Sequence, residues 1–141
     1  MGVNSNLGSY SSLVSAPPPP PPNTLPPPHF STMSFGKNVE FSSICREWRG
    51  KWSKADDNAS LIAVNSLFNE KFLPTLKSME GYEKCQRIVC GGMLDFKFII
   101  QFAESSFPGE NVPGEEPFLI AAEEIEGITG LETQSYTISE L

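Results

Sequence analysis

Hydrophobic and polar residues alternate most regularly along residues 94–102. Every second position there is apolar, and the positions between are mostly polar. The apolar members are Leu94, Phe96, Phe98, Ile100 and Phe102. A period of two places successive side chains on opposite faces of a strand, so this pattern predicts a strand with one buried face.

A glycine pair, Gly91-Gly92, separates this strand from a second apolar-rich run at residues 82–90. Tight two-residue turns need positive φ angles, which glycine adopts without a steric penalty. The two runs are therefore expected to form a β-hairpin.

Two other segments follow a helical period. The first begins at residues 56–58, Asp-Asp-Asn, and the second at residues 115–117, Glu-Glu-Pro. Acidic and short polar residues stabilise the first turn of a helix, where backbone N–H groups are free. Pro74 is expected to kink or end the first helix at about residues 70–73, because proline cannot donate a backbone hydrogen bond.

Strands are also expected at residues 41–53 and 131–138, which gives the order strand, helix, strand, strand, helix, strand. This order predicts a ferredoxin-like α+β fold (βαββαβ) over residues 37–141. Its four-stranded antiparallel sheet would carry two helices on one face and leave the other face open. On the first strand, Cys45, Glu47, Arg49 and Lys51 share one face, while Trp48 and Trp52 share the other.

Residues 1–36 have a different composition. No charged residue precedes Lys37, and nine prolines lie between positions 17 and 28. The segment is expected to be a disordered proline-rich arm. Its polyproline runs could bind a polyproline-recognising protein, or could act as a stiff spacer. The partner-binding candidates are Pro17, Pro18, Pro19, Pro20, Pro21, Pro22, Leu25, Pro26, Pro27 and Pro28.

Net charge and cysteine content limit the possible binding partners and cellular location. The net charge of −7 argues against nucleic acid and anionic membranes as partners, because both favour basic proteins. Three cysteines, an odd number, indicate free thiols and an intracellular, cytoplasmic location. The serine-rich, acid-free arm leaves organelle targeting as an alternative.

The folded region offers little for metal or cofactor chemistry. The only histidine, His29, lies in the arm, and no nucleotide-binding fingerprint occurs. We therefore expect no metal and no cofactor. The weak candidates for catalysis are Cys90, Glu47, Asp95 and Tyr136.

The second half of the chain resembles a known group of domains. The residues that carry this resemblance are Gly92 followed by Asp95-Phe96, and the segment Glu126-Gly127-Ile128 followed by Thr133. They are similar to the dimeric α/β-barrel group of ferredoxin-like domains, most of all to the ligand-sensing domain of Lrp/AsnC regulators. The helix-turn-helix DNA-binding domain of those regulators has no counterpart here. The resemblance implies a homodimer in which two open sheet faces close a barrel around the site.

Two functions follow from these observations. The first is a non-enzymatic dimeric binding or scaffold module whose arm recruits a partner. We favour this function over an enzyme. The alternative is a small cofactor-independent α/β-barrel enzyme acting on a hydrophobic metabolite. The ligand-binding candidates are Trp48, Trp52, Arg49, Lys97, Gln134 and Tyr136.

Overall fold

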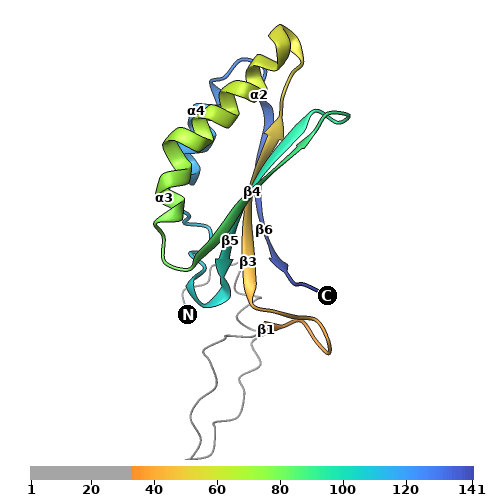
Figure 1. The fold of residues 1–141 in the computed structure, drawn as a ribbon, viewed down its shortest axis with the longest axis vertical. Helices are drawn as coiled ribbons and strands as arrows, with labels where there is room; N and C mark the ends of the chain where they lie inside the picture. The colour runs from red at the N-terminus through yellow and green to blue at the C-terminus, as the bar shows by residue number, and fades with distance from the viewer. Residues whose placement is uncertain (1–32) are drawn as a thin grey trace, which may run out of the picture.

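The computed structural model describes residues 33–141. Its main sheet has four strands: β3 (Ser43–Lys51), β4 (Tyr82–Cys90), β5 (Asp95–Ala103) and β6 (Thr129–Ile138). Their order is β4-β5-β3-β6, and all neighbours are antiparallel. Two helical segments cover one face, α2 (Ala55–Leu67) continuing into α3 (Leu73–Lys77), and α4 (Glu115–Glu123) (Figure 1). The predicted ferredoxin-like fold is confirmed.

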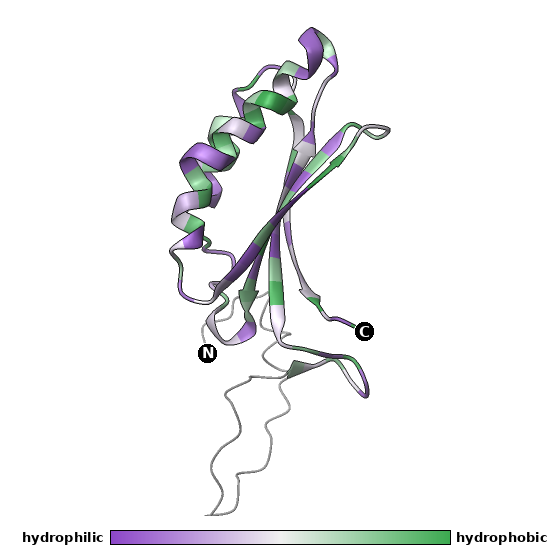
Figure 2. Cartoon of the chain, in the orientation of Figure 1, coloured by the Kyte–Doolittle hydropathy of each residue, from purple (hydrophilic) through white to green (hydrophobic). Residues whose placement is uncertain are grey.

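The core lies between the sheet and the helices. Phe96, Phe98, Ile100 and Phe102 all face it and are at most 2% exposed, as the alternation predicts. Figure 2 shows hydrophobic and hydrophilic residues interspersed along the strands of the sheet. Aromatic rings fill the centre, with Phe68 stacked on Phe98 at a centroid distance of 4.0 Å. No helix among the described residues is long and apolar enough to cross a membrane.

The hairpin between β4 and β5 is confirmed, but its turn differs from the expected two-residue form. Cys90 pairs with Asp95, so four residues, 91–94, form the connection. The residue with a positive φ is Leu94, at 56°, and neither Gly91 nor Gly92 has one. A four-residue loop can place its left-handed residue last, and this removes the requirement for glycine at the centre.

The first helix begins and continues in unexpected ways. Asp56, Asp57 and Asn58 have φ values of 55°, 57° and 66°, so they form a left-handed turn before the regular helix. Short polar Asp and Asn side chains tolerate this conformation better than most residues. Near Pro74 the helix does not stop. A π-helical turn, η1 (Phe68–Phe72), joins α2 to α3, and Pro74 lies in the first turn of α3, where its missing donor is not needed.

The π-helical turn keeps one side of this segment facing the sheet. Its buried residues, Ser60, Val64, Phe68 and Leu76, are separated by four or eight positions. In an α-helix four residues turn through about 400°, which is about 40° more than one full turn. Over the four such steps from Ser60 to Leu76, Leu76 would point about 160° away from Ser60. A π-helical turn takes one extra residue to complete and recovers about 100° of this drift.

A small hairpin precedes β3 and extends from its N-terminal end. It pairs β1 (Met33–Ser34) with β2 (Glu40–Phe41), and Phe35 stacks on Phe41 with centroids 5.1 Å apart. Ser139, after β6, donates a hydrogen bond from Oγ to the carbonyl of Glu40 at 2.6 Å. This hairpin was not predicted, and it begins inside the segment assigned to the arm. The polyproline candidates between positions 17 and 28 lie outside the described residues.

Candidate functional site

The sheet face opposite the helices, here called the open face, carries most of the predicted site residues. Glu47 of β3 lies opposite Gln134, Cys45 lies opposite Tyr136, and Arg49 lies between Lys97 and Glu132. Because side chains alternate along a strand, all of these share one face.

Glu47 is the most buried charged residue on this face, with 2% of its surface exposed. Tyr136 donates its hydroxyl to Oε1 at 2.9 Å, and Gln134 donates from Nε2 to Oε2, also at 2.9 Å. Arg49 Nη1 lies 3.5 Å from Oε2 and also pairs with Glu132 through Nη2 at 3.2 Å. These four residues around Glu47 (Arg49, Glu132, Gln134 and Tyr136) form what we call the Glu47 cluster.

Burial affects the titration of two groups beside Glu47. It raises the pKa of Tyr136, and the hydrogen bond to the Glu47 carboxylate raises that pKa further. The Tyr136 phenol is therefore a neutral proton donor at physiological pH. Burial, followed by the nearby Glu83 charge, raises the pKa of the Cys45 thiol to about 11. Cys45 is thus a poor nucleophile at neutral pH.

The four candidates for catalysis fall into two separate places. Glu47 and Tyr136 are in direct contact, whereas Cys90 and Asp95 pair with each other at the hairpin end of the open face. Asp95 lies opposite Lys51, four residues along β3 from Glu47, which is about 13 Å. The four candidates therefore do not form a single group, and Glu47 and Tyr136 are the two that share a hydrogen bond.

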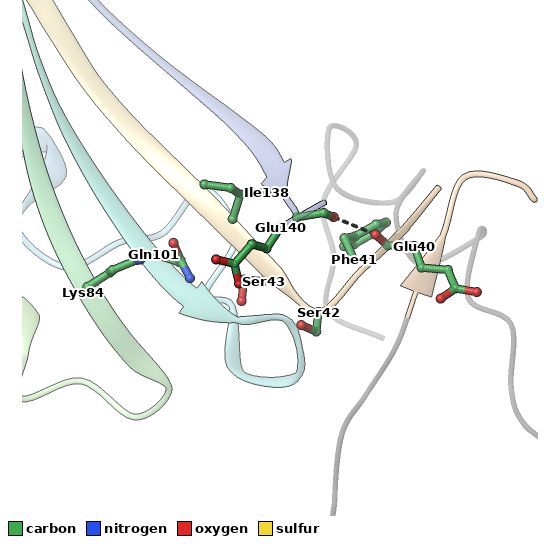
Figure 3. Close-up of a pocket in the computed structure, with 9 residues that line it drawn as sticks. Glu40, Phe41, Ser42, Ser43, Lys84, Gln101, Ile138 and Glu140 are labelled. Carbon is green, nitrogen blue, oxygen red and sulfur yellow. Dashed lines mark hydrogen bonds between the residues drawn. The ribbon is translucent and has the colours of Figure 1, made fainter. Parts of the chain in front are cut away.

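A groove of about 620 Å³ lies at the other end of the open face, shown in Figure 3. It is lined by the end of the small hairpin, by β3, β4 and β5, and by the end of β6. The lining residues are Glu40, Phe41, Ser42, Ser43, Lys84, Gln101, Ile138, Ser139 and Glu140. Ile138 is two residues from Tyr136 on the same face of β6, about 7 Å away, so the groove adjoins the Glu47 cluster.

The two tryptophans among the predicted ligand-binding residues lie on the helix-facing side instead. Trp48 is fully buried and Trp52 is 7% exposed. Their indole N–H groups are both satisfied within the chain, by Glu115 Oε1 at 2.8 Å and by the carbonyl of Asp95 at 3.1 Å. Arg49, Lys97, Gln134 and Tyr136 are brought together on the open face, and the tryptophans are not.

Sequence reasoning missed a polar group under the helices. Arg46 and Glu115 form a two-pronged ion pair, with Nε–Oε1 at 2.8 Å and Nη2–Oε2 at 2.9 Å. Arg46 also donates to the hydroxyls of Ser135 and Thr133. The sequence feature that could have indicated this pair is an arginine at a helix-facing position of an alternating strand. The pair holds the start of α4 on the sheet.

The groove residues were missed as well, since Lys84, Ser43 and Ile138 come from three strands. Within residues 33–141, no group of three or more His, Cys, Asp or Glu side chains is placed to hold a metal ion.

No protein-family model matches the sequence, and no curated protein matches it either. Two solved structures share the fold. One is a monooxygenase from the gene ActVA-Orf6 of Streptomyces coelicolor, in complex with nanaomycin D; its TM-score is 0.56 at 10% identity, over 71% of this chain and 90% of that one. The other, from Deinococcus radiodurans, is described as belonging to the antibiotic biosynthesis monooxygenases; its TM-score is 0.52 at 11% identity, over 70% of this chain and 94% of that one.

These likenesses change the functional expectation. At such low identity they establish the shared ferredoxin-like fold. The finer resemblance to Lrp/AsnC ligand-sensing domains receives no support from them. Because both neighbours are described as monooxygenases, the expectation of a non-enzymatic scaffold, and the leaning away from an enzyme, are corrected in favour of the alternative, a small enzyme.

Proposed function

We propose that the chain is a small enzyme that oxidises a hydrophobic metabolite with O₂, without a cofactor, at the Glu47 cluster. The observation that carries this proposal is the buried hydrogen bond between Tyr136 and Glu47, at 2.9 Å, on the sheet face that the helices leave uncovered. Its occurrence in a fold shared with two monooxygenases supports the reaction class.

The geometry suits proton transfer to an oxidised substrate. The Tyr136 phenol retains its proton because burial and Glu47 both raise its pKa. A neutral phenol can donate its single O–H to a negative charge that develops on a substrate oxygen, and to do so the O–H must turn away from Glu47. Gln134 and Arg49 hold the Glu47 carboxylate in place, so the phenol has the same acceptor to return to after each turnover.

The electrons of such a reaction must come from the substrate. One oxygen atom of O₂ enters the substrate and the other leaves as water, as in the overall conversion R₂CH₂ + O₂ → R₂C=O + H₂O. Both C–H bonds of an activated methylene are broken, and their hydrogens leave in the water. The substrate therefore needs a C–H bond that neighbouring rings or carbonyls make acidic.

A homodimer would complete the site. If the open faces of two copies meet, the Glu47 cluster is shielded from water, and hydrogen bonds to a developing charge are strengthened. We expect a dimer in light scattering, and loss of activity whenever the dimer dissociates.

The test is O₂ consumption by the full chain with a panel of hydrophobic compounds that contain an activated methylene. The decisive variant is Tyr136→Phe, and the matched control is Tyr82→Phe, because Tyr82 packs against the core under the helices. We expect Tyr136→Phe to lower kcat by about 100-fold, the scale of losing one acid–base group, and Tyr82→Phe to retain it. Oxygen uptake that is absent from the wild type, or equal in both variants, would contradict the proposal.

A further inference from the structure

The groove beside the Glu47 cluster contains a hydrogen-bond acceptor that no described residue satisfies. Gln101 Oε1 is buried and accepts no hydrogen bond within residues 33–141. Its orientation is fixed, because Gln101 donates from Nε2 to Glu83 Oε1 at 2.7 Å, and a carboxylate oxygen can only accept. Turning the amide over would set two acceptors against each other. Buried acceptors are normally paired, so this one favours a donor from a ligand.

A hydrogen-bond donor, Lys84, lies beside this acceptor. Lys84 is directly opposite Gln101 in the β4–β5 pairing and also lines the groove. Its ammonium group forms no salt bridge with any described residue. One ligand hydroxyl could therefore donate to Gln101 Oε1 and accept from Lys84 Nζ, because a hydroxyl is both donor and acceptor. Lys84 is exposed, so its long side chain can move to meet a hydroxyl held at the Gln101 oxygen.

The rest of the groove carries charges of both signs and two apolar side chains, Phe41 and Ile138. Glu140 and Lys84 both line it, so either sign of charge meets one like-charged neighbour. The Glu40 carboxylate points away from the other lining residues in Figure 3. Phe41 supplies a buried aromatic wall, and Ile138, 39% exposed, supplies an open apolar one.

We propose that this groove binds a neutral hydroxyl group on a hydrophobic ring compound, an alcohol or phenol, through Gln101 and Lys84. This inference rests on the proposed function, because it assigns the hydroxyl-bearing end of the substrate to the groove and the reacting end to Tyr136. Gln101 and Tyr136 both pair with Cys45, from opposite sides, so two strand spacings, about 10 Å, separate their backbones, which matches a compound of two or three fused rings.

Binding is tested with three probes that differ at one position, 2-naphthol, 2-methoxynaphthalene and naphthalene. Each is titrated into the full chain by calorimetry under anaerobic conditions, so that turnover plays no part. The methyl ether can accept from Lys84 but cannot donate to Gln101. We expect it to bind about tenfold more weakly than 2-naphthol, and naphthalene to bind more weakly still.

Variants locate the site on the open face. Lys84→Met and Gln101→Met should each weaken 2-naphthol about tenfold while leaving naphthalene unchanged. Lys51→Met, an exposed cation at the hairpin end of the same face, opposite Asp95, is the matched control and should bind 2-naphthol as the wild type does. Thermal unfolding of every variant separates loss of the contact from loss of the fold.

The outcomes separate this inference from the proposed function. Equal affinity for 2-naphthol and its methyl ether, no saturable binding, or insensitivity to Lys84→Met and Gln101→Met would each overturn hydroxyl recognition in the groove. Intact binding together with no O₂ uptake by the wild type would overturn only the proposed reaction.

Discussion

Arg46 and Glu47 are consecutive in the chain, yet their buried side chains lie on opposite faces of β3. Arg46 is 6% exposed and pairs with Glu115 beneath the helices, while Glu47 is 2% exposed and accepts from Tyr136 on the open face. One strand therefore carries both the anchor of α4 and the candidate active site. A shift of the strand by one residue would exchange the two faces and leave both charges without their partners.

The Arg46–Glu115 pair should be critical for stability. Replacing Arg46 with Met leaves the Glu115 carboxylate partly buried and without its ion partner, which should lower the free energy of unfolding by about 3–5 kcal/mol. Urea denaturation measures the change. The double variant R46M/E115L should recover part of the loss, because no unpaired charge remains.

Glu132→Gln is the control for this comparison. Glu132 also pairs with an arginine of β3, but its side chain is 63% exposed and that of its partner Arg49 is 39% exposed. Its loss should cost about 0–1 kcal/mol. A similar cost for Arg46→Met and Glu132→Gln would mean that the burial of the Arg46–Glu115 pair has no energetic consequence.

Glu47→Gln tests the coupling between Glu47 and Tyr136. Burial raises the pKa of Tyr136 most, and the hydrogen bond and charge of Glu47 add to it. A glutamine still accepts from the phenol but carries no charge. The pKa of Tyr136 should therefore fall, which an alkaline titration of tyrosinate absorbance detects. Glu132→Gln, on the same face but exposed, should leave the titration unchanged, and an unchanged curve for Glu47→Gln would refute the coupling.

Stability should decrease at alkaline pH. Burial raises the pKa of Cys45 from 9.0 to about 11 and does the same to Cys85. Above pH 9 the unfolded chain releases these protons while the folded chain keeps them. The contribution of each thiol is complete below about pH 9 and is lost as the pH rises to about 11, with a slope of at most about 1.4 kcal/mol per pH unit.

The variant Cys45→Ala should flatten this decline when the free energy of unfolding is measured between pH 8 and 10.5. Val64→Ala, another fully buried position, is the control, because it should lower the whole curve without changing its slope. An identical slope in the wild type and Cys45→Ala would show that the Cys45 thiol does not contribute.

Gly127 should not tolerate a side chain. Its φ is +99°, and a Cβ atom there would lie 2.9 Å from Ser60 Cβ. Gly127→Ala should therefore lower the free energy of unfolding by about 1–3 kcal/mol. Gly92→Ala provides the contrast, because nothing lies within 4 Å of its Cβ position and its φ is not positive. Equal melting temperatures for the two variants would contradict this expectation.

The sequence was sufficient where structure depends on neighbouring residues. The faces of β5 follow from its alternation, because Phe96 and Phe98 must be buried together. Turn geometry was less accessible: Gly91-Gly92 marked the hairpin correctly but not its four-residue length, which the pairing of Cys90 with Asp95 sets.

The candidate site depends on residues far apart in the chain. Its residue types were identified, but the partners of the buried Glu47 carboxylate, Gln134 and Tyr136, come 87 and 89 residues later in the chain, on β6. Arg46 and Glu115 are 69 residues apart. No local pattern indicates that an arginine on a strand will meet the first residue of a distant helix.

The π-helical turn at Phe68–Phe72 contains one residue more than an α-helical turn, so one residue could be removed there without interrupting the helix. Deleting Asn69 would close the turn into regular α-helix and still leave Phe68 and Leu76 facing the sheet, now seven residues apart, or about two turns. The same deletion would extend regular helix into Pro74, whose ring then clashes with the preceding turn at a cost of about 3 kcal/mol. The extra residue of the π-helical turn and the proline therefore depend on each other. A helix shortened by one residue should fold well only when Pro74 is replaced at the same time.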